Sequence, residues 1–455
     1  MRISHTTCQA TTPKGLGGDS WKDSHRPALL SPPHILRWGC FSPDSQIIWL
    51  LFRRNLITNM LMPDRSVKYR VFVSVAEPSA DAHCAALIRA VREKGRDDVE
   101  FLGVGGPKME AAGCRMLQIT VGKAAMMYKA FVFVVHYYLL VRRIRQYLKA
   151  NKVDLVVVCD SPGFNWHVAK AAKTLGIKTL FYVAPQLWAW GSFRIRKLRK
   201  RCDKLCCILP FERQWFNERG LDVTYVGNPM LDGIEIAKER VKEFEHFNAN
   251  SLRVALMPGS RQAEIEDLWV PMQKIALRLR EKYPNVRFIT VAVDVTRKES
   301  LQAGQIPGFE CHYDIGSVHQ TARQVDFAVV ASGSATLEVA AAGCPMVIMY
   351  QSSRFLWHVA GRFIVKTRFL SLVNILAGKE LVPEFMPYFT SIDPMVQDIE
   401  HLLTDKTKLA QMSAELTRLV EPLAAKKASH QTAEILVNML NCAQVQQRQK
   451  CTVKQ

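Results

Sequence analysis

The stretch Asp154-Leu-Val-Val-Val-Cys-Asp-Ser-Pro-Gly-Phe-Asn165 is a run of β-branched residues that ends on a single carboxylate, Asp160. A short, continuous apolar run bounded by turn residues indicates a strand buried on both faces, as in a parallel sheet. The stretch therefore predicts a buried strand, a turn that carries Asp160, and a helix that starts near Asn165.

The same pattern of strand, turn and helix repeats along the chain on both sides of this stretch. Five further strand-like runs share its apolar character in the first half, at 70–76, 100–106, 178–183, 204–209 and 224–227. After a charged, weakly patterned stretch at 232–250, which suits a linker, four more follow at 253–257, 286–291, 327–330 and 345–350. Buried strands that alternate with helices indicate a parallel sheet covered on both faces.

We therefore predict an α/β protein with two Rossmann-like, doubly wound parallel-sheet domains that face a cleft, followed by C-terminal helices. The expected boundaries are 67–235 for the first domain, 250–395 for the second, and 396–455 for the helices and tail. Residues 1–66 match neither domain and lack periodicity, so we expect a mostly disordered extension. Its alternatives are a targeting segment, or a true start at Met60 or Met62.

Composition narrows the class of protein. The 455 residues are 48% hydrophobic and carry a formal net charge of +20, which suits a polyanionic partner such as an anionic lipid, a phosphorylated substrate or a nucleic acid. A nucleic-acid partner is not favoured, because it would rest on charge alone, without a recognised motif. The twelve cysteines lie mostly in apolar runs without a C-x-x-C pair, which favours reduced thiols in a cytosolic protein and no metal site.

Residues directly after the strands are the candidates for chemistry, because open α/β sheets bind ligands beyond the carboxyl ends of their strands. Asp160 could act as a general base that accepts a proton from a sugar hydroxyl, or could simply cap the next helix. Glu77 and Asp81 flank the turn after the first strand and could assist the base or hold a sugar; capping is their alternative. The Gly105-Gly106 turn could let a substrate approach backbone N–H groups, or be an ordinary tight turn.

Two turns in the second half favour an anionic ligand. Gly259, Ser260 and Arg261 join a strand to a helix, where backbone N–H groups and a guanidinium could neutralise a diphosphate. The run 331–338 contains Ser332, Gly333, Ser334 and Thr336 and opens another helix with a second positive end. Glu338 follows in that helix and could accept two ribose hydroxyls. A solvated surface turn and a capping box are the respective alternatives.

Three stretches combine apolar and basic residues. Residues 130–141 are mostly apolar, too short to span a bilayer, and precede Arg142, Arg143 and Arg145. The second is 188–201, with two tryptophans before a basic run, and the third is 354–376. Each could lie in a membrane interface or bind phosphates, and each could equally be a core helix or a solvated face.

Motifs at these positions resemble those of the lipid-A-disaccharide synthases over roughly residues 70–440. Several segments carry the resemblance: Ala76-Glu-Pro-Ser-Ala-Asp81, Gly103-Val-Gly-Gly-Pro-Lys-Met109, Asp160-Ser-Pro-Gly-Phe-Asn165, Tyr182-Val-Ala-Pro-Gln-Leu-Trp-Ala-Trp190, Leu209-Pro-Phe-Glu212, Tyr225-Val-Gly-Asn-Pro229, Leu256-Met-Pro-Gly-Ser-Arg261, Ala331 to Glu338, and Asn374-Ile-Leu-Ala-Gly-Lys-Glu-Leu-Val-Pro-Glu384. Their number and order make chance similarity implausible.

The resemblance implies a GT-B fold and an inverting glycosyl transfer without a metal or other cofactor. The donor would be UDP-2,3-diacylglucosamine and the acceptor 2,3-diacylglucosamine 1-phosphate, giving a β-1,6-linked disaccharide 1-phosphate and UDP. Asp160 would be the base, with Arg261, the 332–336 turn and Glu338 on the donor, and Asn374 and Glu380 lining the donor side. The family is peripheral to the cytoplasmic face of the inner membrane, and the resemblance suggests a homodimer.

The sequence departs from the family pattern in the acceptor half. Ala76 and Ala80 replace two glycines of the first turn, where an alanine with positive φ would be strained. Gly163 replaces a carboxylate near Asp160, and Met127-Tyr128 replaces a Met-Gly pair. Two alternatives follow: another UDP-sugar enzyme of this fold, such as one like UDP-GlcNAc 2-epimerase, or an inactive relative that binds UDP-sugars or lipid.

Overall fold

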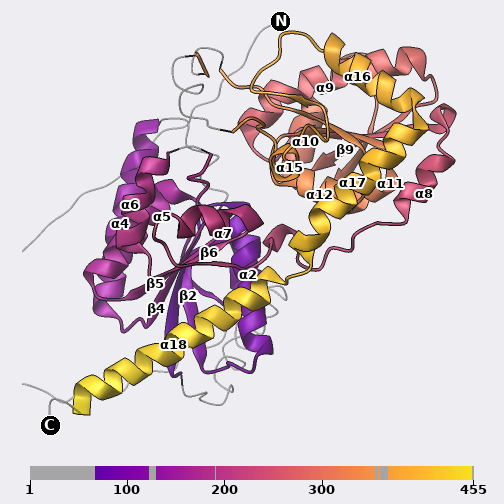
Figure 1. The fold of residues 1–455 in the computed structure, drawn as a ribbon. Helices are drawn as coiled ribbons and strands as arrows, with labels where there is room; N and C mark the ends of the chain where they lie inside the picture. The colour runs from indigo at the N-terminus through magenta and orange to yellow at the C-terminus, as the bar shows by residue number, and fades with distance from the viewer. Residues whose placement is uncertain (1–66, 122–129, 190, 354–356, 359–366, 453–455) are drawn as a thin grey trace, which may run out of the picture. The chain divides into compact units, whose positions relative to one another are not determined.

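The computed structural model describes residues 67–121, 130–189, 191–353, 357–358 and 367–452 (Figure 1). The predicted extension at 1–66, the Met127-Tyr128 pair and most of 354–366 lie outside these residues. The described chain contains two parallel sheets with helices on their faces, so the predicted GT-B fold class is confirmed. We call residues 67–231 with the first sheet the first lobe, and residues 232–424 with the second sheet the second lobe.

The first sheet has seven strands in the order β3-β2-β1-β4-β5-β6-β7, and all neighbouring strands are parallel. Its elements, in chain order, are β1 (Tyr69–Ser74), α2 (Pro78–Glu93), β2 (Val99–Gly105), α3 (Pro107–Ala111), β3 (Arg115–Ile119), α4 (Ala130–Ala150), β4 (Leu155–Cys159), α5 (Pro162–Thr174), β5 (Lys178–Tyr182), α6 (Ile195–Arg201), β6 (Lys204–Cys207), α7 (Pro210–Asn217) and β7 (Val223–Tyr225). The quoted stretch forms β4, whose five residues are all buried, as predicted for a parallel strand.

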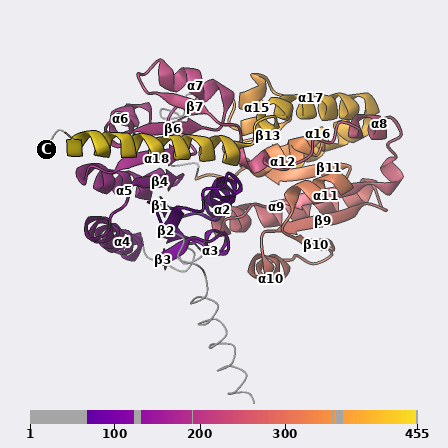
Figure 2. The ribbon, with the colours of Figure 1, turned by 90° about the horizontal axis from the view of Figure 1, so that it is seen from below.

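The second sheet has six parallel strands in the order β10-β9-β8-β11-β12-β13 (Figure 2). Its elements are α8 (Arg240–Glu245), β8 (Arg253–Met257), α9 (Gln262–Lys282), β9 (Arg287–Ala292), α10 (Val295–Ala303), β10 (His312–Ile315), α11 (Val318–Gln324), β11 (Phe327–Ala331), α12 (Ala335–Ala341), β12 (Met346–Met349), α15 (Leu372–Ala377), β13 (Glu384–Phe385), α16 (Asp393–Thr404) and α17 (Lys406–Ala424). In both sheets the order reverses beside the first strand, which is the doubly wound arrangement.

The charged stretch at 232–250 is packed more firmly than a free linker. Arg240 is 2% exposed, and its guanidinium donates hydrogen bonds to the carbonyl oxygens of Ala322 and Val325 at 2.6 Å each. A buried charge needs such partners, because an unpaired one would cost several kcal/mol. Arg240 therefore fixes α8 to the second lobe, an anchor that the weak pattern of this stretch did not reveal.

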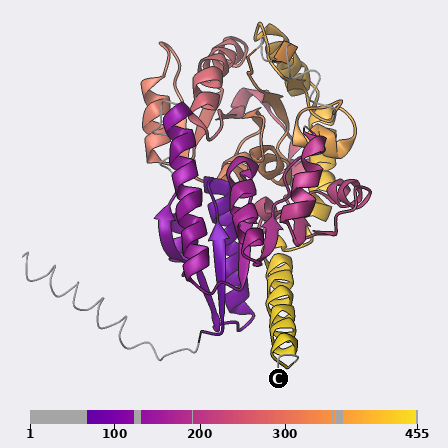
Figure 3. The same cartoon turned by 90° about the vertical axis from the view of Figure 1, so that its left-hand side faces the viewer.

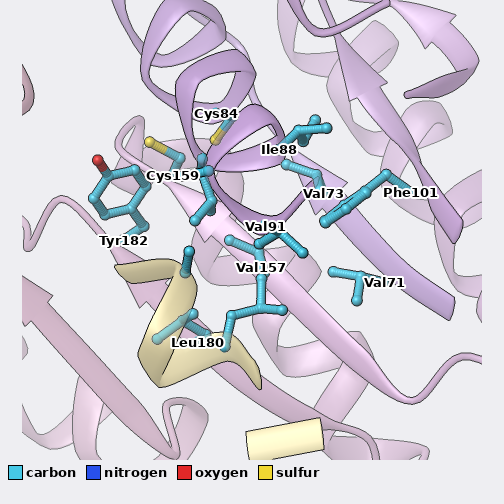
Figure 4. Packing of buried hydrophobic residues seen from close by; sticks show 14 of the residues in the cluster. Val71, Val73, Cys84, Ile88, Val91, Phe101, Val157, Cys159, Leu180 and Tyr182 are labelled. Carbon is cyan, nitrogen blue, oxygen red and sulfur yellow. The ribbon is translucent and has the colours of Figure 1, made fainter. Parts of the chain in front are cut away.

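The last helix, α18 (Ala428–Thr452), returns to the first lobe and packs against α2, and Figure 3 shows it running alongside the first sheet. Ala433, Leu436 and Leu440 of this helix belong to the same buried cluster as the inward-facing residues of β1, β4 and α2. Figure 4 shows part of this cluster, in which the free thiols of Cys84 and Cys159 lie near each other, between Tyr182 and Ile88. The C-terminal helix is thus part of the core of the first lobe.

Helices α4, α5 and α6 cover the opposite face of the first sheet. Leu140, Ile144 and Leu148 of α4 pack with residues of β4, α5 and α6 in a second buried cluster. Within the residues that the structure describes, no helix is long and apolar enough to cross a membrane.

Candidate active site

The reversal of strand order places four turns at the positions where doubly wound sheets bind ligands. In the first lobe the reversal lies between β1 and β4, so the turns carrying Glu77 and Asp160 are neighbours. In the second lobe it lies between β8 and β11, which brings together the turn at 259–261 and the turn at 332–334. Sequence order alone had suggested these turns, and the topology makes them pairs.

Asp160 follows β4 in a strained backbone conformation. Its φ is 50° and that of Ser161 is 42°, both in the left-handed region that non-glycine residues rarely adopt. Asn165 holds this turn: its Nδ2 donates to the carbonyl oxygens of Cys159 and Asp160 at 2.9 and 2.8 Å, and its Oδ1 accepts from Ser74 at 2.8 Å. Backbone strain of this kind persists where surrounding contacts hold the conformation in place, and it is common at functional sites.

The carboxyl of Asp160 has a higher pKa than that of an ordinary aspartate. Burial raises its pKa, and the negative charge of Glu77 raises it further, while the Ser161 N–H and the more distant Arg261 act in the opposite direction. A raised pKa makes a carboxylate a stronger proton acceptor once it is ionised. The environment of Asp160 therefore suits a general base.

Glu77 connects the turn that carries Asp160 with Arg261 of the second lobe. Its Oε1 accepts a hydrogen bond from the hydroxyl of Ser161 at 3.0 Å, and its Oε2 lies 3.4 Å from Nη2 of Arg261 in the second lobe. The side chain of Arg261 remains 70% exposed. The structure thus brings together Asp160, the predicted base, with Glu77 and with Arg261, which is predicted to bind phosphate.

Asp81 has a different surrounding. It is 1% exposed, and its two carboxylate oxygens accept three backbone N–H bonds of 3.0 Å from Gly106, Lys108 and Met109. A β-carbon on Gly106 would lie 2.4 Å from Asp81 Oδ2, so only glycine fits there. Asp81 lies within α2 and does not cap it, as its alternative expected; its carboxylate binds the N-terminal N–H groups of α3 instead, including that of Gly106. Gly105 is the buried end of β2. A role of these three residues toward substrate stays a prediction.

The departures from the family pattern in this turn do not strain it. Among the described non-glycine residues, a positive φ occurs at Asp160, Ser161 and Val183. Ala76 and Ala80 therefore do not have the positive φ that would strain an alanine. Gly163 has open space where a β-carbon would be.

The turn after β8 is folded around Glu264 of α9. Gly259 has a φ of 102°, and the backbone N–H groups of Ser260 and Arg261 donate to Glu264 Oε2 at 3.1 and 3.2 Å. Nη1 of Arg261 donates to the other carboxylate oxygen at 3.1 Å. The three donors expected to meet a diphosphate therefore converge on one point, which a carboxylate occupies here.

The turn after β11 presents exposed backbone. Gly333 and Ser334 are exposed, while the N–H of Ser332 donates to the Met349 oxygen at 2.9 Å. Thr336 is buried, and its hydroxyl donates to the Gly333 oxygen at 2.7 Å, which stabilises the turn from below. Of the predicted residues in this turn, Gly333 and Ser334 are therefore the accessible ones.

Glu338 lies one helical turn further on. Burial raises its pKa to about 7, opposed by a hydrogen bond with the backbone of His319. When it is ionised, this carboxylate can accept hydrogen bonds from hydroxyl groups.

Asn374 and Glu380 lie on the segment that precedes β13. Asn374 is fully buried, and its amide bonds the backbone of Leu381 and Val382 and the carboxylate of Glu384. Glu380 is exposed at the tip of the same segment. Asn374 thus shapes the loop that presents Glu380, and the assignment of both residues to the donor side stays a prediction.

Sequence reasoning missed several residues that build the site: Ser161, Asn165 and Glu264. Ser161 and Asn165 lie inside the quoted stretch, but nothing in their spacing shows which backbone groups they bind. Glu264 had a signal, because a Glu three residues after the turn is typical of a capping box. Among the described residues, no group of three His, Cys, Asp or Glu side chains is placed to hold a metal ion.

The sequence of this chain is similar to those of known proteins. A sequence model of the lipid-A-disaccharide synthetase family matches residues 71–439. The chain is 31% identical over 379 residues to a lipid-A-disaccharide synthase of Trichlorobacter lovleyi, covering 82% of this chain and 97% of that protein. It is 32% identical over 386 residues to lipid-A-disaccharide synthase 1 of Legionella pneumophila, covering 83% of this chain and 98% of that protein.

Solved structures agree on the fold. UDP-GlcNAc 2-epimerase from Neisseria meningitidis bound to UDP-GlcNAc has a TM-score of 0.55, with 11% identity, over 82% of this chain and 99% of that one. At this identity the likeness shows a shared fold and does not favour the epimerase alternative.

Proposed function

Because this chain belongs to the lipid-A-disaccharide synthetase family, we propose that it joins UDP-2,3-diacylglucosamine to 2,3-diacylglucosamine 1-phosphate. The products would be the β-1,6-linked lipid A disaccharide 1-phosphate and UDP. The observation that supports this proposal is the contact of Glu77 with both Ser161 and Arg261, because it brings the turn of the proposed base, Asp160, close to the turn proposed to bind the diphosphate.

The reaction follows from this arrangement. Asp160 accepts the proton of the acceptor's 6-hydroxyl while that oxygen forms a bond to the anomeric carbon of the donor. The bond between this carbon and the phosphate oxygen breaks, and UDP leaves with the electron pair. Attack from the side opposite the leaving group inverts the anomeric centre. A positioned base of this kind contributes about 10²–10⁴-fold to a rate.

The second lobe would hold the donor. Arg261 and the exposed Gly333–Ser334 backbone are the groups that can neutralise the diphosphate. Glu338 would accept the ribose hydroxyls.

The face of the first lobe formed by α4, α5 and α6 suits an anionic membrane surface. No acidic residue occurs in any of the three helices. Exposed cations are spread over α4 and α6, namely Arg142, Arg143, Arg145, Lys149, Arg196, Lys197, Arg199 and Lys200. Tyr138, Leu139 and Phe193 are exposed by 68%, 54% and 73% beside them. Apolar side chains among cations bind anionic bilayers by insertion and charge attraction together.

Both substrates are acylated, so a membrane-facing first lobe would place the site within their reach. Peripheral binding to the cytoplasmic face of the inner membrane is therefore part of the proposal. A homodimer stays a prediction from the family resemblance.

The test is to incubate the purified protein with both acylated sugars and to detect UDP and the disaccharide by mass spectrometry. Replacement of the donor by UDP-GlcNAc controls for an enzyme that acts on unacylated sugars. Binding of UDP without formation of disaccharide under any condition would instead identify an inactive relative.

A further inference from the structure

The carboxylate of Glu264 occupies the centre of the turn that follows β8. It accepts hydrogen bonds from the N–H groups of Ser260 and Arg261 and from the guanidinium of Arg261, all between 3.1 and 3.2 Å. The side chain is only 13% exposed, whereas that of Arg261 is 70% exposed. The donors of the turn are therefore engaged by an anion that belongs to the protein itself.

The backbone is built to let this carboxylate approach. Gly259 has a φ of 102°, and a β-carbon at this position would lie 2.5 Å from Oε2 of Glu264. Any other residue would thus be strained and would also displace the carboxylate. Ordinary helix capping by a Glu at this position requires one backbone N–H bond. Glu264 forms two such bonds and an ion pair.

A diphosphate bound at this turn would need the same three donors. Phosphate oxygens and a carboxylate are both anionic acceptors, and they cannot share one small set of N–H groups without like-charge repulsion. On the proposed function, the donor's diphosphate is the anion that comes to this turn. The arrangement therefore sets Glu264 and the diphosphate in competition.

We propose that Glu264 is an internal competitor for the nucleotide's diphosphate, displaced when the UDP-sugar binds and restored when UDP leaves. In the empty site its carboxylate keeps the donors of the turn paired, which avoids the cost of unsatisfied polar groups. As UDP departs, the returning carboxylate replaces it on the same donors. Glu264 thus lowers the affinity for UDP and promotes product release.

The experiment measures binding of three probes, UDP, inorganic pyrophosphate and uridine, to the full chain by calorimetry. Glu264→Gln keeps an oxygen that can accept the backbone N–H bonds but removes the charge and the ion pair with Arg261. We expect UDP and pyrophosphate to bind about fivefold to tenfold more tightly to the variant, from the loss of a like charge at short range. Uridine, which lacks phosphate, should bind unchanged.

Glu266→Gln is the matched control, because Glu266 is exposed, lies on the same helix, carries the same charge and accepts a hydrogen bond of 2.9 Å from the Gln262 amide. It should leave all three affinities unchanged. Glu264→Ala removes the competitor altogether, and it should also tighten binding of both phosphates if its melting curve remains cooperative.

Weaker or unchanged binding of pyrophosphate and UDP to Glu264→Gln would overturn the proposal, the former by showing that Glu264 positions Arg261 for the ligand. This result is distinct from a failure of the proposed function, which would show as absence of disaccharide. If the wild-type chain did not bind UDP at all, the pyrophosphate measurement would still decide the role of Glu264.

Discussion

The hydroxyl of Ser161 donates a hydrogen bond of 3.0 Å to the carboxylate of Glu77, and this bond joins the ends of the two central strands of the first sheet. It holds the negative charge of Glu77 close to Asp160, where that charge raises the pKa of the aspartate. The strength of the proposed base therefore depends on a neighbour that need not touch the reacting atoms.

Glu77→Gln should move the acid limb of the pH–rate profile to lower pH. The amide can still accept the Ser161 hydrogen bond, but it no longer repels the ionised form of Asp160, so the pKa of Asp160 falls. The profile of kcat against pH, measured from pH 4 to 9, checks this. A limb that stays in place or moves to higher pH would show that Glu77 does not set the pKa of the base.

Asp160→Asn should nearly abolish transfer and yet stabilise the fold. Loss of a general base costs about 10²–10⁴-fold in kcat. Burial raises the folded-state pKa of Asp160 above its unfolded value, so ionisation disfavours the folded state, with the full cost above the folded pKa and none below the unfolded one. Asparagine also tolerates the φ of 50°.

Thermal unfolding of this variant should therefore show a higher midpoint at pH 8, with the gain lost at pH 3. UDP binding serves as the control and should be kept. A variant that transfers sugar at the wild-type rate would exclude Asp160 as the base.

UDP affinity should fall as the pH drops below about 7, the value to which burial raises the pKa of Glu338. Protonation removes the charge that accepts the ribose hydroxyls, and a hydrogen bond to a charged group contributes about 1.5–3 kcal/mol. Glu338→Gln should weaken UDP binding about tenfold at pH 8 and flatten this dependence. Pyrophosphate lacks a ribose, so its affinity should not respond to the substitution.

Glu212→Gln should destabilise the first lobe. Glu212 is fully buried and accepts hydrogen bonds from Trp188 Nε1 at 2.8 Å and from the N–H groups of Ile208 and Leu209 at 3.1 and 3.0 Å. An amide cannot accept all three, because its NH₂ group would face at least one donor, so we expect a loss of about 2–3 kcal/mol. Denaturant unfolding measures it, with the exposed Glu218→Gln as control.

The basic face of the first lobe should bind anionic vesicles. Replacing Arg142 and Arg143 by serine removes two exposed charges, each worth about 1 kcal/mol near a charged surface, and should lower vesicle binding more than tenfold. Tyr138→Ser with Leu139→Ser should reduce binding at high salt as well, since it removes insertion rather than charge. Val270→Ser, an exposed change on the second lobe, is the control.

The fold was predictable because its strands are buried on both faces. Runs such as that of β4 are continuous in the sequence, and their alternation with helices leaves few topologies. Strands β3, β10 and β13 were not predicted. β3 and β10 have no fully buried residue, so their apolar pattern is diluted, and β13 has only two residues.

The site was predictable at its backbone turns and less so at its hydrogen bonds. The position of Asp160 after β4 follows from the sheet alone. The contact of Asp81 with Gly106 joins residues 25 positions apart and is specified by no spacing in the sequence, whereas the contact of Glu264 with Arg261 has the three-residue spacing of a capping box. Asp81 and Glu264 are both acidic residues beside a turn, but we expect different roles for them. Asp81 fixes the backbone of its turn, whereas Glu264 is proposed to compete with the ligand.

The packing of α18 on the first lobe also constrains how the chain folds during its synthesis. Side chains from 428–440 complete a core whose other members begin at β1, so the first-lobe strands emerge from the ribosome long before their covering helix exists. Until then the apolar side chains of α2 that pack on α18 lack their cover, and exposed apolar surface of this kind favours aggregation. The buried clusters of the second lobe are drawn from one continuous stretch, 231–424, and so need no residue of α18.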